Sequence, residues 1–137
     1  MNVLIGCEYS GVVRDAFAAR GHNAWSCDLL PSDRPNPKHR QGDIFDMIDG
    51  DWDLAIFHPP CTDLAISGAA HFPEKIKDGR QQRAIEFVER LYNCDIPRIC
   101  IENPVGVLST KSKLGKPTQY VQPYEYGHFE TKKTGLW

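Results

Sequence analysis

The sequence lacks the features that mark a membrane, disulfide-rich or zinc-binding protein. No apolar run approaches the roughly 18 residues of a membrane span, and residues 1–6 lack the basic start and long apolar core of a signal peptide. The number of cysteines, five, is odd, and none of them has Cys-x-x-Cys spacing. The five histidines are scattered along the chain without the spacing of metal ligands. We therefore expect a cytoplasmic protein with reduced cysteines, no membrane partner and no metal site.

Strong net charge is also absent. The 137 residues carry a formal net charge of -2, which by itself does not indicate nucleic-acid binding, and the length fits one domain, residues 1–137. Basic residues are concentrated at positions 34–40 and in the tail, which includes Lys132 and Lys133. Such patches can follow a phosphate backbone, although solvated surface loops show the same composition.

Strand and helix patterns alternate along the chain. Short apolar runs typical of buried strands occur at residues 3–5, 24–27, 54–57 and 98–101. Apolar residues recur at helical spacing over residues 12–19 and 80–93. The alternation predicts a doubly wound, mostly parallel α/β sheet, a fold in which the loops at the carboxyl ends of the strands bind ligands.

The most informative motif is His58-Pro59-Pro60-Cys61, directly after the apolar run 54–57. Paired prolines end a strand and fix the direction of the exit loop, because proline has no N–H for the ladder. The Cys61 thiol is then expected at the carboxyl edge of the sheet, where a soft nucleophile can attack an electrophilic carbon. A lone cysteine is more often a small buried residue, but the proline context favours a nucleophile.

Two glycines and two acids predict a site for an adenosine-bearing ligand. Gly6 and Gly11 flank the first loop and would let a ligand approach the backbone closely. Asp28 ends the second strand, where an acid can accept hydrogen bonds from a ribose diol, and Asp43 could receive an adenine amino group. Each acid alone would equally suit a strand end or a helix cap.

Glu102-Asn103-Pro104 is the second sharp motif. It follows a buried apolar run and is expected to stop that strand, so that Glu102 emerges at the edge of the cleft. A carboxyl group half out of water can stay protonated and donate a hydrogen bond. Pairing with a nearby arginine such as Arg98 is the structural alternative.

These motifs, in this order and spacing, resemble the S-adenosylmethionine-dependent DNA cytosine-5 methyltransferases. Residues 2–11 are similar to the opening of small methyltransferase-like proteins of phages and prophages. The resemblance implies a Rossmann-like methyltransferase fold, S-adenosylmethionine as cofactor and DNA as partner in the host cytoplasm. It implies that Cys61 adds to C6 of cytosine, while Glu102 donates to N3 and accepts from the 4-amino group.

The resemblance also implies which residues bind the cofactor and the substrate. For the cofactor these are Gly6, Tyr9, Ser10, Gly11, Asp28, Asp43, Ile44 and Pro59. For the substrate they are Pro60, Asn103, Lys132 and Lys133.

The sequence departs from the family's pattern in several places. Glu8 and Tyr9 stand in the glycine-rich loop, Thr62 follows Pro-Cys, and Pro104 follows Glu-Asn. The family's target-recognition part is not among the 137 residues, so we expect a minimal or C-terminally shortened catalytic domain. An oligomer or a helper subunit could supply that part.

Two other interpretations remain open. One is methyl transfer to another acceptor, either a free nucleotide or a base amino group. The other is a non-catalytic domain that binds cofactor, DNA or a protein.

Overall fold

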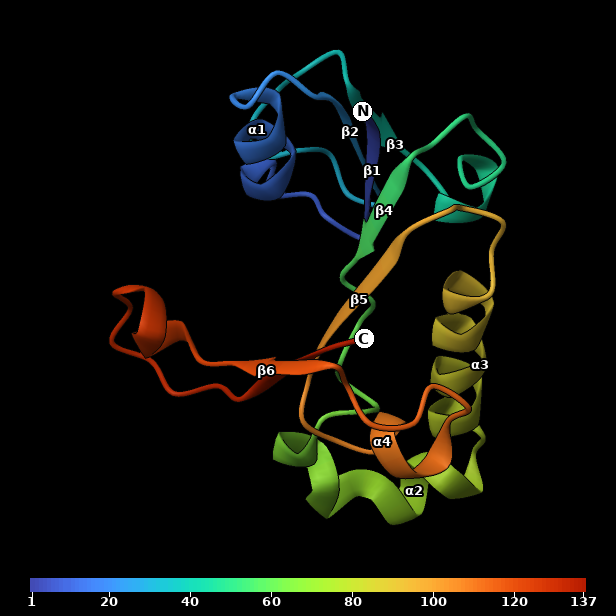
Figure 1. Cartoon of the computed structure of the whole chain (residues 1–137). Helices are drawn as coiled ribbons and strands as arrows, with labels where there is room; N and C mark the ends of the chain where they lie inside the picture. The colour runs from blue at the N-terminus through green and yellow to red at the C-terminus, as the bar shows by residue number, and fades with distance from the viewer. The chain divides into compact units, whose positions relative to one another are not determined.

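The computed structural model describes residues 1–137 and contains a seven-stranded mixed, mostly parallel sheet (Figure 1). The strand order is β3-β2-β1-β4-β5-β7-β6, and its 3-2-1-4-5 part is Rossmann-like. The predicted α/β class with a mostly parallel sheet is confirmed. No helix is both long enough and apolar enough to cross a membrane.

The chain divides into two compact units. The first contains residues 1–58 and 94–100, and the second contains residues 59–93 and 101–137. The chain therefore passes from one unit to the other between His58 and Pro59, inside the proline motif.

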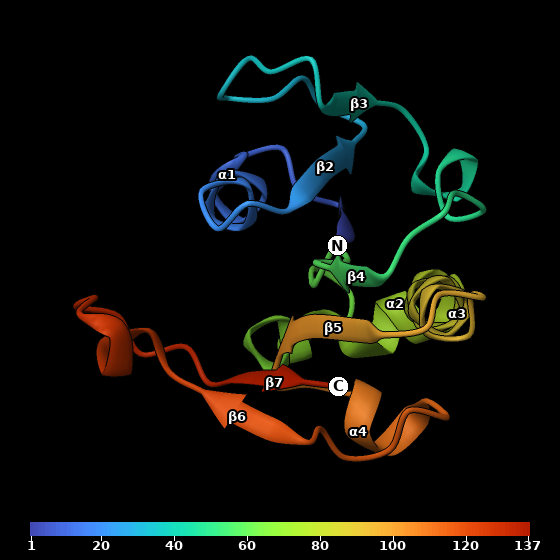
Figure 2. The same cartoon turned by 45° about the horizontal axis from the view of Figure 1, so that its top comes forward.

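The first unit has a parallel sheet built on β1. Its elements are β1 (Asn2–Gly6), α1 (Val12–Ala18), β2 (Asn23–Asp28), β3 (His39–Gln41), η1 (Ile44–Asp46) and β4 (Leu54–Phe57). β1 pairs in parallel with both β2 and β4. Val3 and Ile5 of β1 form a buried cluster against which Val13 and Phe17 of α1 pack, and Figure 2 shows α1 beside β2. Within this sheet β1 is the strand whose residues are apolar and buried on both faces, from Val3 to Gly6.

The second unit combines helices with an antiparallel group of strands. Its elements are η2 (Ile66–His71), α2 (Phe72–Lys77), α3 (Arg80–Tyr92), most of β5 (Ile99–Pro104), α4 (Leu108–Lys111), β6 (Gln119–Val121), η3 (Pro123–Tyr126) and β7 (Thr134–Leu136). β7 lies between β5 and β6 and runs antiparallel to both (Figure 2). α3 buries Ile85, Val88 and Leu91 at the helical spacing that the sequence predicted.

Glu102-Asn103-Pro104 does not stop the strand before it, so that prediction was wrong. β5 extends through Pro104, and all three residues pair with β7. The strand continues because β7 supplies partners along this edge, and a proline is tolerated at the last position of a strand. Backbone pairing continues just beyond Pro104, because the Val105 amide donates to the Lys133 carbonyl at 3.0 Å.

Gly106 joins the segment after β5 to the segment after Cys61. The Val107 amide donates to the Leu64 carbonyl at 3.0 Å, and Ala65 and Gly106 form an antiparallel bridge. A Cβ atom on Gly106 would overlap the Leu64 carbonyl oxygen and would lie 2.9 Å from the Ala65 Cα. Only glycine allows these two backbones to approach so closely.

Gly106→Ala is therefore expected to lower the free energy of unfolding by at least about 2 kcal/mol, because backbone atoms must move apart. Urea unfolding measures this. Gly21→Ala is the control: Gly21 has φ +83° but nothing within 4 Å of its Cβ position, so only the backbone cost of about 1 kcal/mol is expected. Equal losses in the two variants would contradict the steric account.

Candidate functional site

Gly6 is required by packing. A Cβ atom there would overlap the Phe57 ring and would lie 2.8 Å from Cδ1 of Ile44, which is itself buried. The predicted cofactor residues Gly6 and Ile44 therefore meet inside the first unit, where the absence of a side chain on Gly6 makes room for two apolar ones.

Gly11 makes room for a buried arginine. It precedes α1 with φ +75°, and a Cβ atom there would lie 2.6 Å from Nη2 of Arg14. Arg14 is 1% exposed and donates to the Ser26 hydroxyl at 3.0 Å and to the Arg34 carbonyl at 3.1 Å. Its guanidinium thus holds the proline-rich loop, a role that the sequence did not reveal.

A pocket of about 310 Å³ opens at the carboxyl end of β1. Its lining residues are Cys7, Glu8, Tyr9, Ser10, Val13 and His58. The predicted cofactor residues Tyr9 and Ser10 are among them. Cys7 has φ +57°, an uncommon conformation for a residue with a side chain, and such strain is typical of functional sites.

Asp28 and Asp43 come together beside this pocket. Burial, with contributions from Asp28, Cys27 and Asp43, raises the pKa of the Cys7 thiol to about 12. Both carboxylates are thus close enough to Cys7 to oppose its ionisation. Each also accepts a local hydrogen bond at 2.9 Å, Asp28 from the Leu30 amide and Asp43 from the Phe45 amide. Both acids thus have the ordinary turn and cap roles that the sequence also allowed, and their binding of a ligand stays a prediction.

Glu8 gives the pocket a buried negative charge. Its side chain is 6% exposed, and Oε1 accepts from the Ser10 hydroxyl at 2.5 Å and from the Val13 amide at 3.3 Å. Oε2 is buried and has no hydrogen-bond partner. A buried carboxylate oxygen without a partner suits a cationic or hydrogen-bond-donating ligand better than a phosphate-bearing one.

The segment containing Cys61 is held by Asn103 in the second unit. Asn103 is fully buried, and its Nδ2 donates to the Pro59 carbonyl at 2.9 Å. Pro59 is buried, Pro60 is exposed and Cys61 is half-buried. The Cys61 carbonyl accepts from the amides of residues 64 and 65 at 3.0 and 2.9 Å, so a turn begins at the thiol-bearing residue.

Buried polar side chains from the neighbouring helices hold the loop after Cys61. Lys75 of α2 is 6% exposed, donates to the Thr62 carbonyl and lies 3.3 Å from the Asp63 carboxylate. Gln81 of α3 donates to the Asp63 carbonyl at 3.3 Å. Sequence reasoning missed both residues, because lysine and glutamine are usually exposed.

Glu102 is half-buried on β5, opposite Leu136 of β7. Successive side chains of a strand point to opposite faces, so Glu102 and Asn103 divide between the two faces of β5. Pro59, Pro60 and Cys61 of the first motif lie in the same unit as Glu102-Asn103-Pro104, and the bond from Asn103 to Pro59 ties the two segments together.

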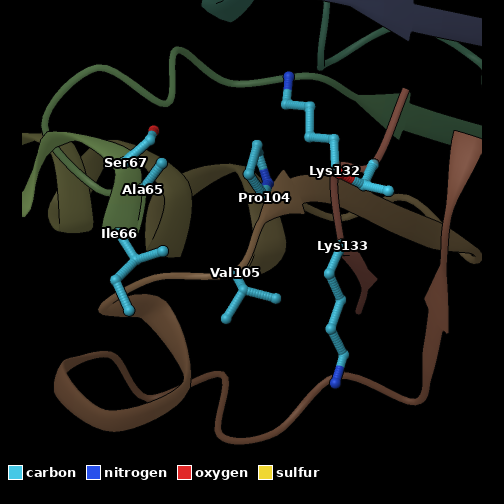
Figure 3. A pocket seen from close by; sticks show the side chains of 8 residues that line it. Ala65, Ile66, Ser67, Pro104, Val105, Lys132 and Lys133 are labelled. Atoms are coloured by element: carbon cyan, nitrogen blue, oxygen red, sulfur yellow. The ribbon is translucent and has the colours of Figure 1, made fainter. Parts of the chain in front are cut away.

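Lys132 and Lys133 line a second pocket, of about 240 Å³, in the second unit (Figure 3). It is completed by Ala65, Ile66, Ser67, Pro104, Val105 and Thr131. Figure 3 shows the two lysine side chains extending in opposite directions. The Lys133 ammonium lies 4.4 Å from the centre of the Tyr120 ring, a cation–π contact. The predicted substrate lysines thus lie beside Pro104 of the second motif.

Comparison with known proteins matches the chain to no protein-family model and to no curated protein. The motifs and the geometry of the site are therefore the grounds for assigning a function.

Asn103→Asp tests whether the buried amide holds the motif. The variant removes the donor to Pro59 and buries a carboxylate, so we expect a loss of about 3 kcal/mol in the free energy of unfolding. Faster hydrogen exchange at the amides of Leu64 and Ala65 should accompany it. The control is Asn36→Asp, at an exposed residue whose Oδ1 accepts from the Lys38 amide, because aspartate keeps that acceptor. A loss no larger than in the control would contradict the assignment.

Cys7 and Cys27 should react slowly with iodoacetamide in the folded chain. Burial raises the pKa of Cys27 to about 11 and that of Cys7 to about 12, from 9.0. A raised pKa means less thiolate, so at pH 8 Cys7 holds roughly a thousandfold less of the reactive form than an unperturbed cysteine. Peptide mapping after timed alkylation, with the urea-unfolded chain as control, measures this. Equal labelling of Cys7 in the two states would refute the prediction.

Proposed function

We propose that this chain is an S-adenosylmethionine-dependent methyltransferase whose acceptor is C5 of cytosine in DNA. The observation that carries the proposal is the buried hydrogen bond from Asn103 to the Pro59 carbonyl, at 2.9 Å. It ties the segment containing Glu102 to the segment containing Cys61, although the two residues are 41 positions apart in the sequence. These are the two groups that cytosine-5 chemistry needs at one pyrimidine ring.

The first unit is assigned to the cofactor, which supplies a methyl group on a sulfonium sulfur. Tyr9 and Ser10 would lie along its amino-acid part, since they line the pocket at the end of β1. Asp28 would accept hydrogen bonds from the ribose hydroxyls, and Asp43 from the adenine amino group. Support comes from their positions in the fold, since Asp28 is the last residue of β2 and Asp43 caps η1, which follows β3.

The second unit is assigned to the base. Cys61, as thiolate, adds to C6 of the cytosine and directs electrons toward C5. Glu102 donates a proton to N3 and accepts from the 4-amino group, so that negative charge does not accumulate on the ring. The sulfonium would supply the methyl group to C5, its sulfur–methyl bond breaking to leave a neutral thioether. Loss of the C5 proton expels the thiolate and restores the aromatic ring.

The remaining residues are positioning residues in this proposal. Asn103, Lys75 and Gln81 fix the backbone on both sides of Cys61, which keeps the thiol in one place. Lys132 and Lys133 would contact phosphate, and a base in duplex DNA would be flipped out of the stack. The setting is the cytoplasm, where the cysteines stay reduced.

A free cytosine nucleotide is the second candidate acceptor. The net charge of -2 and the pocket of about 240 Å³ beside two lysines suit a single phosphate group as well as a polymer. Salt separates the two acceptors, because binding to DNA weakens steeply as salt is raised while binding to one nucleotide changes little.

Covalent trapping tests the proposal. Incubation of the chain with S-adenosylmethionine and DNA containing 5-fluorocytosine should give an adduct on Cys61, because fluorine at C5 cannot leave as a proton does. Intact-mass and peptide mass spectrometry detect the adduct. Cys61→Ser should form none, and Glu102→Gln should slow its formation by roughly 100-fold or more.

Cys94→Ser is the matched control, since Cys94 is half-buried and belongs to the first unit; it should form the adduct at the wild-type rate. Methyl transfer by Cys61→Ser at the normal rate would overturn the mechanism. Cofactor binding without adduct or turnover would favour the non-catalytic interpretation.

A further inference from the structure

Glu8 lines the first-unit pocket, and one of its carboxylate oxygens has no hydrogen-bond partner. Glu8 is 6% exposed, so its charge is largely removed from water. One oxygen is used by Ser10 and Val13, while Oε2 is buried and accepts no hydrogen bond. A buried charge normally has an ionic partner, because isolated burial is costly. The structure supplies half of such a pair.

No cationic side chain of the first unit fills this role. Neither lysine nor arginine lines the pocket. The nearby buried base, Arg14, directs its guanidinium to Asp15 at 2.9 Å and to Ser26 at 3.0 Å. Asp28 and Asp43 add further negative charge beside Cys7. The pocket is therefore an anionic environment that lacks a counter-ion.

We propose that Glu8 is the binding group for the ammonium of an amino-acid-type ligand, with Oε2 accepting its hydrogen bond. The proposal rests on the proposed function in naming that ligand as S-adenosylmethionine, whose methionine part carries an α-ammonium. A charge-assisted hydrogen bond to a buried carboxylate is strong and selective. The same carboxylate would repel a phosphate, so the site discriminates against nucleotide cofactors that carry one.

The geometry also explains why a carboxylate is accommodated in a loop where the resembled enzymes have glycine. Oε1 satisfies the Val13 amide at the start of α1 and the Ser10 hydroxyl. Glu8 would therefore recognise the ligand's ammonium with a side chain instead of the backbone. Its Oε1 is held by Ser10 and Val13, and its Oε2 is left for the ligand.

A binding cycle tests the role of Glu8. Calorimetry compares S-adenosylhomocysteine with its deaminated analogue, in which hydrogen replaces the amino group, for the wild type and Glu8→Gln. The glutamine oxygen can still accept from Ser10 and Val13, so the fold should be kept. We expect the wild type to prefer the ammonium-bearing ligand by roughly 10- to 100-fold. Glu8→Gln should lose most of that preference.

Asp49→Asn, at an exposed acid outside the pocket, is the control and should bind both ligands as the wild type does. If Glu8→Gln keeps the full preference for the ammonium, the proposal is overturned.

A second measurement separates this proposal from the proposed function. If the wild type binds neither adenosyl compound, the cofactor assignment fails, and thermal unfolding in methylammonium chloride against sodium chloride at equal ionic strength decides the role of Glu8. A cation site stabilises the wild type more than Glu8→Gln. Equal shifts in the two proteins would overturn the ammonium site as well.

Discussion

The buried amide of Asn103 holds a segment that cannot hold itself. Pro59 and Pro60 have no N–H groups, so this stretch offers only carbonyl oxygens and cannot extend a strand ladder through its own donors. A side-chain donor from another element must fix it, and Asn103 does so from β5 at 2.9 Å. This contact fixes the chain before Cys61, while Lys75 and Gln81 hold the loop that follows it. Asn103 is fully buried, so its amide is removed from the competition of water.

The two units divide the chemistry that the sequence motifs suggest. The first has the acids and the pocket at the end of a parallel sheet, where such folds bind ligands. The second has the cysteine, the half-buried Glu102 and a cluster of polar side chains that fixes the loop between the proline motif and α2. The first of the three points at which the chain passes between the units is the His58–Pro59 bond, inside the most informative motif.

Periodicity predicted the elements that bury apolar side chains and failed where pairing or polar burial decides the structure. The run 54–57 gives β4 with the predicted ends, and α3 buries the predicted stripe, because apolar patterns report burial directly. The extension of β5 through Pro104 depends on β7, which lies 30 residues further along and is a local pattern of only three residues. The residues around Pro104 carry no information about a pairing strand so far along the chain.

The sequence also left the role of Gly6 in the candidate site ambiguous. The sequence interpretation of Gly6 was close approach by a ligand, whereas the structure shows the space filled by Phe57 and Ile44. Both uses need the same missing Cβ, so composition alone cannot separate them. The buried positions of Glu8 and Lys75 were equally hidden, because charged residues are expected at the surface unless a partner is known.

The polar side chains behind the cysteine loop form a connected chain rather than separate contacts. Lys75 holds Thr62 and Asp63, Gln81 holds Asp63, and Lys111 of α4 donates to the Gln81 oxygen at 2.9 Å. The neighbouring helices α2 and α3 and the later helix α4 thus share one network of polar contacts, and the effect of altering one contact depends on whether the others are intact. Substitutions in α2, α3 and α4 should therefore be epistatic, so that evolution can change this part of the protein only by changing several residues together.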